Sequence, residues 1–317
     1  MSIEQHSVPE ALHGARLDQA AVVIFPDYSR SRLSAWIKSG RLTVNGETGR
    51  PKDKVAVGDQ LALRPEAEPA VSWSAQAMPL AIVYEDDDVI VVNKPAGLVV
   101  HPAAGHADGT LVNALLAHEP YLDKLPRAGI VHRLDKDTSG IMFVARSERA
   151  HKSLVSQLSK RTVSRHYLAV CQGALTAGGM IDAPMSRHPT QRTKMAVVRD
   201  GKPAVTHYRI RQRFAHFTAL DVQLETGRTH QIRVHMAYRK MPLLGDPLYG
   251  GRLRMPPGAS TELATALQGW KRQALHAYHL MFQHPATLQT VDFTVPIPDD
   301  LAQLLAVLSA HDILEDA

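Results

Sequence analysis

A proline-containing, aperiodic stretch at residues 64–79 most constrains the fold, because it separates two regions with different hydrophobic patterns. The stretch holds three prolines and shows neither helical nor strand periodicity, so we interpret it as a linker. A chain of 317 residues has room for about two ordinary domains. We therefore expect a small domain with its linker at residues 1–75 and a larger domain at residues 76–317.

The first region has the pattern of a helix followed by a β-hairpin. Within residues 31–40, the side chains of Leu33, Trp36 and Ile37 fall on one helical face. Residues 42–46 predict a strand that enters an Asn-Gly turn, and residues 57–63 predict the returning strand. Four basic residues surround the helix, with no acidic residue between Tyr28 and Arg41: Arg30, Arg32, Lys38 and Arg41. The pattern resembles the alpha-L RNA-binding module of ribosomal protein S four, with a generic small α+β domain as the alternative.

The second region predicts an α+β domain with a mixed, mainly antiparallel sheet. Residues 89–92 and 141–145 are short apolar runs typical of buried strands, and residues 217–225 alternate between apolar and polar. An amphipathic helix is expected at residues 148–161, with Leu154, Val155 and Leu158 facing inward. Residues 205–213 also alternate and place a basic stripe on one face: His207, Arg209, Arg211 and Arg213. Such a stripe is most often solvated surface, but it also suits phosphate groups.

The charge of the chain is concentrated in one block. The formal net charge is only +5, yet residues 151–255 carry 18 basic and 5 acidic side chains. These charges repel one another in the folded state, and a polyanion such as nucleic acid would compensate them. From charge alone, a merely solvated basic face is an equally good interpretation.

Several classes of protein lose support from the composition. The single cysteine, Cys171, excludes an internal disulfide and a cysteine-rich zinc cluster, and we expect it to be a buried, inert thiol. No apolar signal core or membrane-spanning run is present, so we expect a soluble cytoplasmic protein that does not contact the membrane. No glycine-rich phosphate loop occurs. His276 and His279 lack a third nearby ligand, so we expect interior histidines rather than a metal site.

Ionisable residues gather in the segment 129–140, where a turn joins two apolar runs. A calcium loop beginning at Asp135 would need a carboxylate at its twelfth position, which is Arg146 here. A phosphatase of the haloacid-dehalogenase type would need an apolar strand directly before Asp135, but His132 and Arg133 stand there. A kinase catalytic loop is one residue shorter and is followed by an Asp-Phe-Gly motif that this chain lacks.

The motif His132-Arg133-Leu134-Asp135, followed by Lys-Asp-Thr-Ser-Gly at 136–140, resembles the catalytic motif of the RluA family of pseudouridine synthases. Four further segments match that family in order and spacing, at residues 93–97, 165–173, 224–235 and 245–250. The resemblance spans nearly the whole chain. It implies that the alpha-L module precedes a catalytic domain whose sheet is divided by a central RNA cleft.

The resemblance also implies roles for individual residues. Asp135 is the expected catalytic carboxylate, and Arg228 is expected to lie beside it and keep it ionised. Tyr167 offers a ring on which uracil can stack and a phenol that can assist removal of the proton on carbon 5. Arg133 is the candidate wedge that fills the space of an extruded base. Residues expected to support the site structurally are His132, Thr138, Gly140, Gly227 and His230.

The resemblance further implies an isomerisation of uridine to pseudouridine that needs no cofactor and no metal. Within the family, residues 188–195 and 201–210 are most similar to members that act on large-subunit ribosomal RNA. The resemblance implies clustered uridines of the stem-loop called helix 69 as the leading target. We expect RNA contacts from the helix residues Arg30, Arg32, Lys38 and Arg41 and from Arg209 and Arg211. We expect a monomer whose partner is large-subunit ribosomal RNA or the assembling large ribosomal subunit. We do not expect it to bind DNA. The alternatives are another ribosomal site or transfer RNA as substrate, or an RNA-binding ribosome-assembly factor with incidental catalysis.

Overall fold

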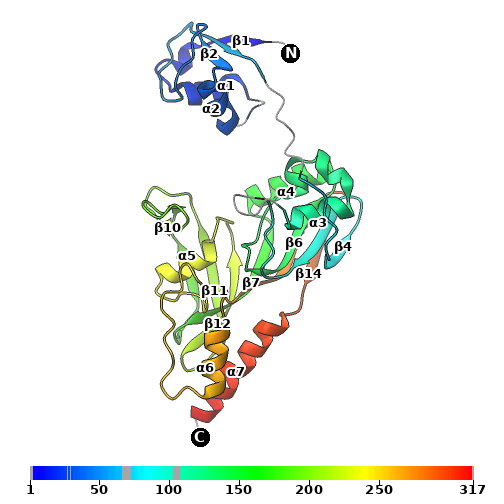
Figure 1. The fold of residues 1–317 in the computed structure, drawn as a ribbon, viewed down its shortest axis with the longest axis vertical. Coiled ribbons are helices and arrows are strands. Elements are labelled where there is room, and N and C mark those ends of the chain that lie inside the picture. Colours follow the sequence, from blue (N-terminus) through cyan, green and yellow to red (C-terminus); the bar gives the residue numbers. More distant parts are fainter. Residues whose placement is uncertain (1–2, 27, 29, 66–72, 103–107, 316–317) are drawn as a thin grey trace. The chain divides into compact units, whose positions relative to one another are not determined.

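The computed structural model describes residues 3–26, 28, 30–65, 73–102 and 108–315, and we treat it as two compact units, Met1–Ser72 and Trp73–Ala317. Figure 1 labels the elements of both units along the chain. Residues 66–72 of the expected linker lie outside the described residues.

The first unit is a small α+β domain. Its helices are α1 (Leu17–Ile24) and α2 (Arg30–Lys38), and a 3-10 turn spans Glu10–Leu12. Its three-stranded antiparallel sheet has the order β1-β3-β2, with strands β1 (Glu4–Ser7), β2 (Leu42–Val44) and β3 (Gln60–Leu63). Leu33, Trp36 and Ile37 are buried as predicted. Asn45 and Gly46 both adopt positive φ, which the predicted tight Asn-Gly turn requires.

The second unit is built on a nine-stranded sheet with the order β4-β5-β6-β13-β7-β12-β11-β8, and β14 pairs with β13. The strands are β4 (Ile82–Glu85), β5 (Val89–Lys94), β6 (Ser139–Ala145), β7 (Ser164–Gln172), β8 (Gly179–Asp182), β11 (Val205–Arg213), β12 (Phe217–Leu224), β13 (Leu275–Gln283) and β14 (Thr290–Thr294). Only β6 and β13 pair in parallel, while the other pairs are antiparallel. The predicted mixed, mainly antiparallel sheet is therefore confirmed.

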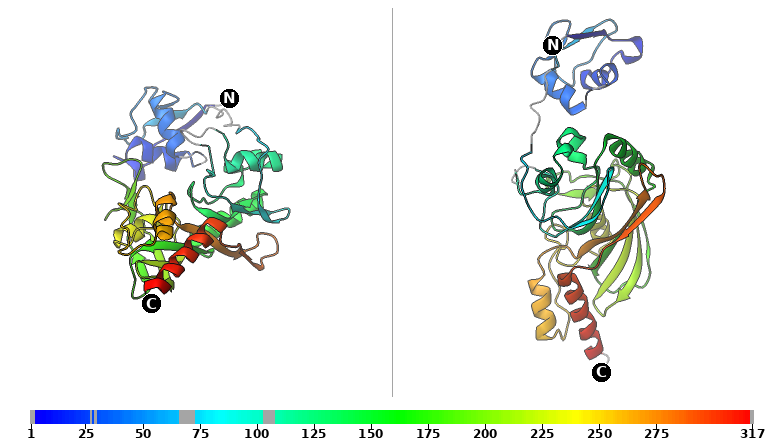
Figure 2. Two further views of the ribbon diagram at one scale, coloured as in Figure 1. Left: turned by 60° about the horizontal axis from the view of Figure 1, so that its bottom comes forward. Right: turned by 90° about the vertical axis from the view of Figure 1, so that its right-hand side faces the viewer.

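Helices and a separate hairpin complete this unit. The helices are α3 (Leu111–His118), α4 (Glu148–Lys160), α5 (Gln231–Tyr238), α6 (Thr261–Gly269) and α7 (Asp299–Glu315), with 3-10 turns at Pro120–Lys124 and Pro126–Gly129. Strands β9 (Met185–Arg187) and β10 (Met195–Val197) form the hairpin. Figure 2 shows the sheet and its helices in two further views. On α4, Leu154 is fully buried as expected, but the inward position predicted for Val155 is wrong because that side chain faces solvent.

Strand β13 connects the two strands that carry the candidate site. Its residue Ala277 pairs with Gly140 of β6 on one side and with Tyr167 of β7 on the other. Gly140 has φ of +120°, and a Cβ atom there would lie 2.1 Å from the carbonyl oxygen of Ala277. Only glycine therefore allows β6 to approach β13 in this way, and this approach fixes the turn before β6 relative to Tyr167.

Candidate active site

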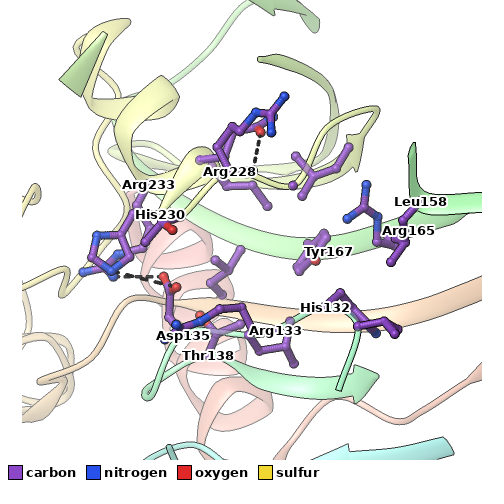
Figure 3. A pocket seen from close by; sticks show the side chains of 18 of the residues that line it. His132, Arg133, Asp135, Thr138, Leu158, Arg165, Tyr167, Arg228, His230 and Arg233 are labelled. Atoms are coloured by element: carbon purple, nitrogen blue, oxygen red, sulfur yellow. Dashed lines mark hydrogen bonds and ion pairs between the residues drawn. The ribbon is translucent and has the colours of Figure 1, made fainter. Parts of the chain in front are cut away.

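A pocket of about 360 Å³ opens where the turn before β6, strand β7 and the loop between β12 and α5 meet (Figure 3). The turn contributes Asp135, and β7 contributes Tyr167. Gly227 and Arg228 enter from the loop. The structure thus brings together residues from three segments that the sequence analysis singled out separately.

Asp135 is held by a buried arginine of helix α5. Nη1 of Arg233 donates a hydrogen bond to Oδ2 of Asp135 over 2.9 Å. The same guanidinium binds Asp246 bidentately, with Nε to Oδ2 at 2.7 Å and Nη2 to Oδ1 at 2.9 Å. Burial opposes ionisation of Asp246, but the hydrogen bonds and charge of Arg233 hold the pKa of Asp246 below its usual range. One permanent cation therefore orients Asp135 and is itself fixed by a second carboxylate.

The expected contact between Arg228 and Asp135 is wrong. Nε of Arg228 donates to the carbonyl oxygen of Pro203 over 3.1 Å, although the residue lines the same pocket. Arg228 belongs to the loop before α5, whereas Arg233 lies in the first turn of that helix and faces the buried side. A signal for Arg233 was present in the sequence, because a cation between Ile232 and Val234 on a buried helix requires a carboxylate partner.

Backbone contacts hold the turn that carries Asp135. The amide of Thr138 donates to the carbonyl oxygen of Asp135 over 3.1 Å, and Oγ1 of Thr138 accepts from Nε2 of Gln273. The buried Lys94 donates from Nζ to the carbonyl oxygens of Pro95, Leu98 and Lys136, at 2.8 to 2.9 Å. These contacts restrict the turn on both sides of Asp135.

His132 and Arg133 precede Asp135 and face different environments. Nε2 of His132 accepts a hydrogen bond from the amide of Phe143 over 3.1 Å, and burial with the nearby charge of Arg165 lowers the pKa of His132 to about 3. His132 is therefore a neutral imidazole that joins the motif to β6. Arg133 is exposed and lines the pocket.

A buried amide positions the loop between β12 and α5. Oε1 of Gln231 accepts from Oγ1 of Thr226 and from the amide of Arg228, at 2.8 and 3.0 Å. The helix starts after His230, which has φ of 57°. The contributions of Thr226 and Gln231 were missed, although a buried Gln at a helix start demands such partners.

His230 lies close to Asp135 without pairing tightly with it. Its Nε2 is 3.9 Å from Oδ1 of Asp135, and its Nδ1 is 2.8 Å from the hydroxyl of Tyr249. Burial lowers the pKa of His230, which favours the neutral ring. His230 thus lies beside the carboxylate as a polar side chain that lines the pocket.

Tyr167 lies on β7 and is only 6% exposed. Burial raises the pKa of its phenol above the usual range, so the neutral form predominates near neutral pH. A neutral ring is well suited to stacking against a base, but it is a poor proton acceptor. The arrangement therefore favours the stacking part of the expected role of Tyr167 over proton removal.

The other expected RNA-contacting residues lie outside this pocket. Arg30 pairs with Asp18 over 2.8 Å, and the guanidinium of Arg32 lies over the ring of Trp36 at 4.5 Å. Lys38 is exposed, and Arg41 is partly buried. Arg209 and Arg211 lie on β11, where Arg211 pairs with Asp221 over 3.3 Å.

Of the cysteine and histidines expected in the interior, Cys171 and His276 are buried, whereas His279 is half-buried. Cys171 is buried, and burial raises the pKa of its thiol to about 12. His276 hydrogen-bonds to Ser139 at 3.0 Å, and His279 pairs with Asp292 at 2.7 Å. Ile232 and Met236 are buried. Within the described ranges, we find no group of three or more metal-ligating side chains and no helix long and apolar enough to cross a membrane.

Comparison with known proteins identifies the family. Residues 88–238 match the family described as RNA pseudouridylate synthase, and residues 15–61 match the S4 domain. The chain is 57% identical to "Ribosomal large subunit pseudouridine synthase D" of Pseudomonas aeruginosa over 95% of this chain and 94% of that protein. The chain belongs to the RNA pseudouridine synthase family. Its fold class is confirmed as an N-terminal S4 domain followed by a pseudouridine synthase domain, and it is an isomerase.

Further relatives of this pseudouridine synthase agree. A protein of the same name from Xanthomonas campestris is 54% identical, over 97% of this chain and 93% of its own. The solved structure titled "Human RNA Pseudouridylate Synthase Domain Containing 4" has a TM-score of 0.57 and 26% identity, and covers 72% of this chain and 93% of that one. Asp135, Tyr167, Arg228 and Arg233 of the candidate site lie within residues 88–238, the segment that matches the family.

Proposed function

We propose that this pseudouridine synthase isomerises uridines of large-subunit ribosomal RNA, with clustered uridines of the helix 69 stem-loop as its target. The names of relatives at 54% and 57% identity over nearly the whole chain support the ribosomal substrate. The 18 basic side chains of residues 151–255 and the S4 domain support binding to a polyanion. Loop uridines also cost less to unstack than uridines in a duplex.

The single observation that carries the catalytic proposal is the Arg233–Asp135 pair in a pocket walled by Tyr167. Asp135 is the proposed nucleophile, and its side chain is 17% exposed, which leaves it open to a substrate. The guanidinium stabilises the carboxylate and fixes its direction. The reaction breaks the bond between N1 of uracil and the ribose, turns the base and rejoins it through carbon 5. Carbon 5 loses a proton and N1 gains one, so the product is an isomer of the substrate.

The other pocket residues have proposed roles in substrate placement. Tyr167 stacks against the uracil, and the exposed Arg133 fills the space that the extruded nucleotide leaves. Arg228 contacts the substrate from the loop rather than serving as the partner of Asp135. His132, Thr138, Gly140, Gly227 and His230 keep the surrounding backbone in place.

Mapping pseudouridines in total RNA tests this proposal. Cells that lack the protein should lose the modification at helix 69, and the wild-type gene should restore it. The Asp135→Asn gene should not restore it at equal protein level. Loss at another ribosomal site or in transfer RNA would correct the target, and an unchanged map would refute the function.

A further inference from the structure

Arg165 is a buried cation that the proposed function does not use. It lies on β7, it lines the pocket, and the residue is only 7% exposed. Its buried Nε has no hydrogen-bond partner. In the part of the chain that the structure describes, no carboxylate pairs with its guanidinium.

An arginine in this state is energetically unfavourable for the free enzyme. The guanidinium carries a permanent positive charge. Its Nε is fully buried without a hydrogen-bond partner, and an unsatisfied buried donor of a charged group is unfavourable. The pocket cannot supply a counter-charge from the described residues, because Asp135 is its only lining carboxylate and already binds Arg233. A ligand that develops negative charge beside Arg165 would remove this cost.

The location of Arg165 indicates which part of the substrate it meets. Arg165 and Tyr167 are two residues apart on one strand, so their side chains share a face. Tyr167 is within electrostatic range of both Arg165 and Asp135, whose opposite charges act on its phenol. In Figure 3, Tyr167 lies between Asp135 and Arg165. A uracil stacked on Tyr167 with its ribose bond at Asp135 would direct its carbonyl-bearing edge toward Arg165.

We propose that Arg165 is a catalytic residue that stabilises negative charge on a uracil carbonyl oxygen during the isomerisation. This inference rests on the proposed placement of the uracil. If Asp135 attacks the sugar, the N1–ribose bond breaks and its electron pair spreads over N1 and the two carbonyl oxygens. If Asp135 adds to carbon 6, the electron pair of the ring double bond moves onto the oxygen of carbon 4. On either route the bond from Asp135 breaks again and carbon 5 takes the place of N1 on the ribose. Carbon 5 then loses a proton while N1 gains one, so the oxygens end uncharged.

The burial of Arg165 favours the base over a backbone phosphate as its ligand. Phosphodiesters remain hydrated and are usually bound by exposed side chains, and the exposed Arg133 already borders this pocket. A buried, fixed donor is most effective where charge develops only in the transition state. Arg165 should therefore affect the rate of the chemical step more than RNA affinity.

Single-turnover kinetics with a helix 69 stem-loop transcript test the proposal, with RNA affinity measured in parallel. Arg165→Met should lower the rate of pseudouridine formation by about 10²- to 10³-fold, as loss of an oxyanion donor does, while Kd changes by less than about threefold. Arg165→Lys keeps the charge and should recover part of the rate. Lys271→Met, at an exposed cation outside both the pocket and residues 151–255, is the control for loss of a positive charge and should behave as wild type.

A second variant moves the guanidinium without removing it. A Cβ atom at position 227 would lie 2.6 Å from Nη1 of Arg165, so Gly227→Ala should displace that group and slow the same step. This variant decides the case if Arg165→Met fails to fold.

Two outcomes would overturn the proposal. One is a wild-type rate in folded Arg165→Met. The other is an unchanged rate with weaker RNA binding. In that case the slope of the logarithm of the RNA association constant against the logarithm of the salt concentration would become shallower by about 0.7 to 0.9, which would identify a phosphate contact. If wild type does not modify the transcript, the proposed target is wrong, and the same variants are compared on large-subunit RNA from cells that lack the enzyme.

Discussion

The guanidinium of Arg233 lies 2.9 Å from Asp135 and 2.7 Å from Asp246, so one buried cation joins two carboxylates at the pocket. The side chain of Asp246 is fully buried, and that of Arg233 is 5% exposed. Asp246 therefore fixes Arg233, and Arg233 in turn fixes the proposed nucleophile. The proposed nucleophile thus gains its direction from helix α5 and from the segment after it.

Replacing Arg233 should cost far more stability than replacing Arg228. Arg233→Gln leaves the buried Asp246 without its cation and should lower the free energy of unfolding by about 3 to 5 kcal/mol. Arg228→Gln removes an exposed hydrogen bond to the carbonyl oxygen of Pro203 and should cost less than about 1 kcal/mol. Urea denaturation of both variants measures the difference, and equal losses would contradict the role assigned to Arg233.

The close approach of β6 to β13 predicts a strong effect at Gly140. Gly140→Ala would place a Cβ atom 2.1 Å from the carbonyl oxygen of Ala277, so we expect a loss of about 3 kcal/mol or more, or failure to fold. Gly173→Ala is the matched control, because Gly173 also has positive φ but has open space around it. It should cost only about 1 to 2 kcal/mol from backbone strain. Similar thermal unfolding of the two variants would show that the contact with Ala277 is not limiting.

His132 should make the protein less stable in acid. Its pKa is about 3 in the folded protein, below the unfolded value near 6.5, so unfolding takes up a proton between these values. The free energy of unfolding should fall with pH from about 6.5 toward 3, and this residue contributes up to about 1.4 kcal/mol per pH unit. Urea titrations at pH 6 and pH 4.5 should show a shallower dependence in His132→Gln. An unchanged dependence would mean that His132 is charged in the folded protein.

The S4 unit should contribute affinity rather than chemistry. Removing residues 1–72 takes away the basic helix α2 but no residue that lines the pocket. We expect Kd for the stem-loop to rise and its salt dependence to become shallower, because fewer phosphates are neutralised. The single-turnover rate at saturating enzyme should stay within a few-fold of the full chain. A folded truncation with a collapsed rate would place catalytic groups in the first unit.

The sequence predicts those parts of the fold that are determined by interactions between residues close in the chain. The Asn45-Gly46 turn, the buried face of α2 and the α+β class follow from turn chemistry and hydrophobic periodicity. The motif at 132–135 marked the position of the proposed nucleophile, Asp135. The partner of Asp135 could not be predicted in the same way, because Arg228 and Arg233 are close in sequence and about a hundred residues beyond Asp135. Choosing between them requires the start of α5 and the register of β13 between β6 and β7, which are set by tertiary packing.

The central claim is that Asp135 performs the chemistry, and the most direct test is pseudouridine formation by Asp135→Asn on the helix 69 stem-loop. The amide oxygen can still accept a hydrogen bond from Arg233, so the variant should fold and bind RNA with a Kd close to that of wild type. Single-turnover analysis should then detect no pseudouridine. Turnover near the wild-type rate by this variant would contradict the account.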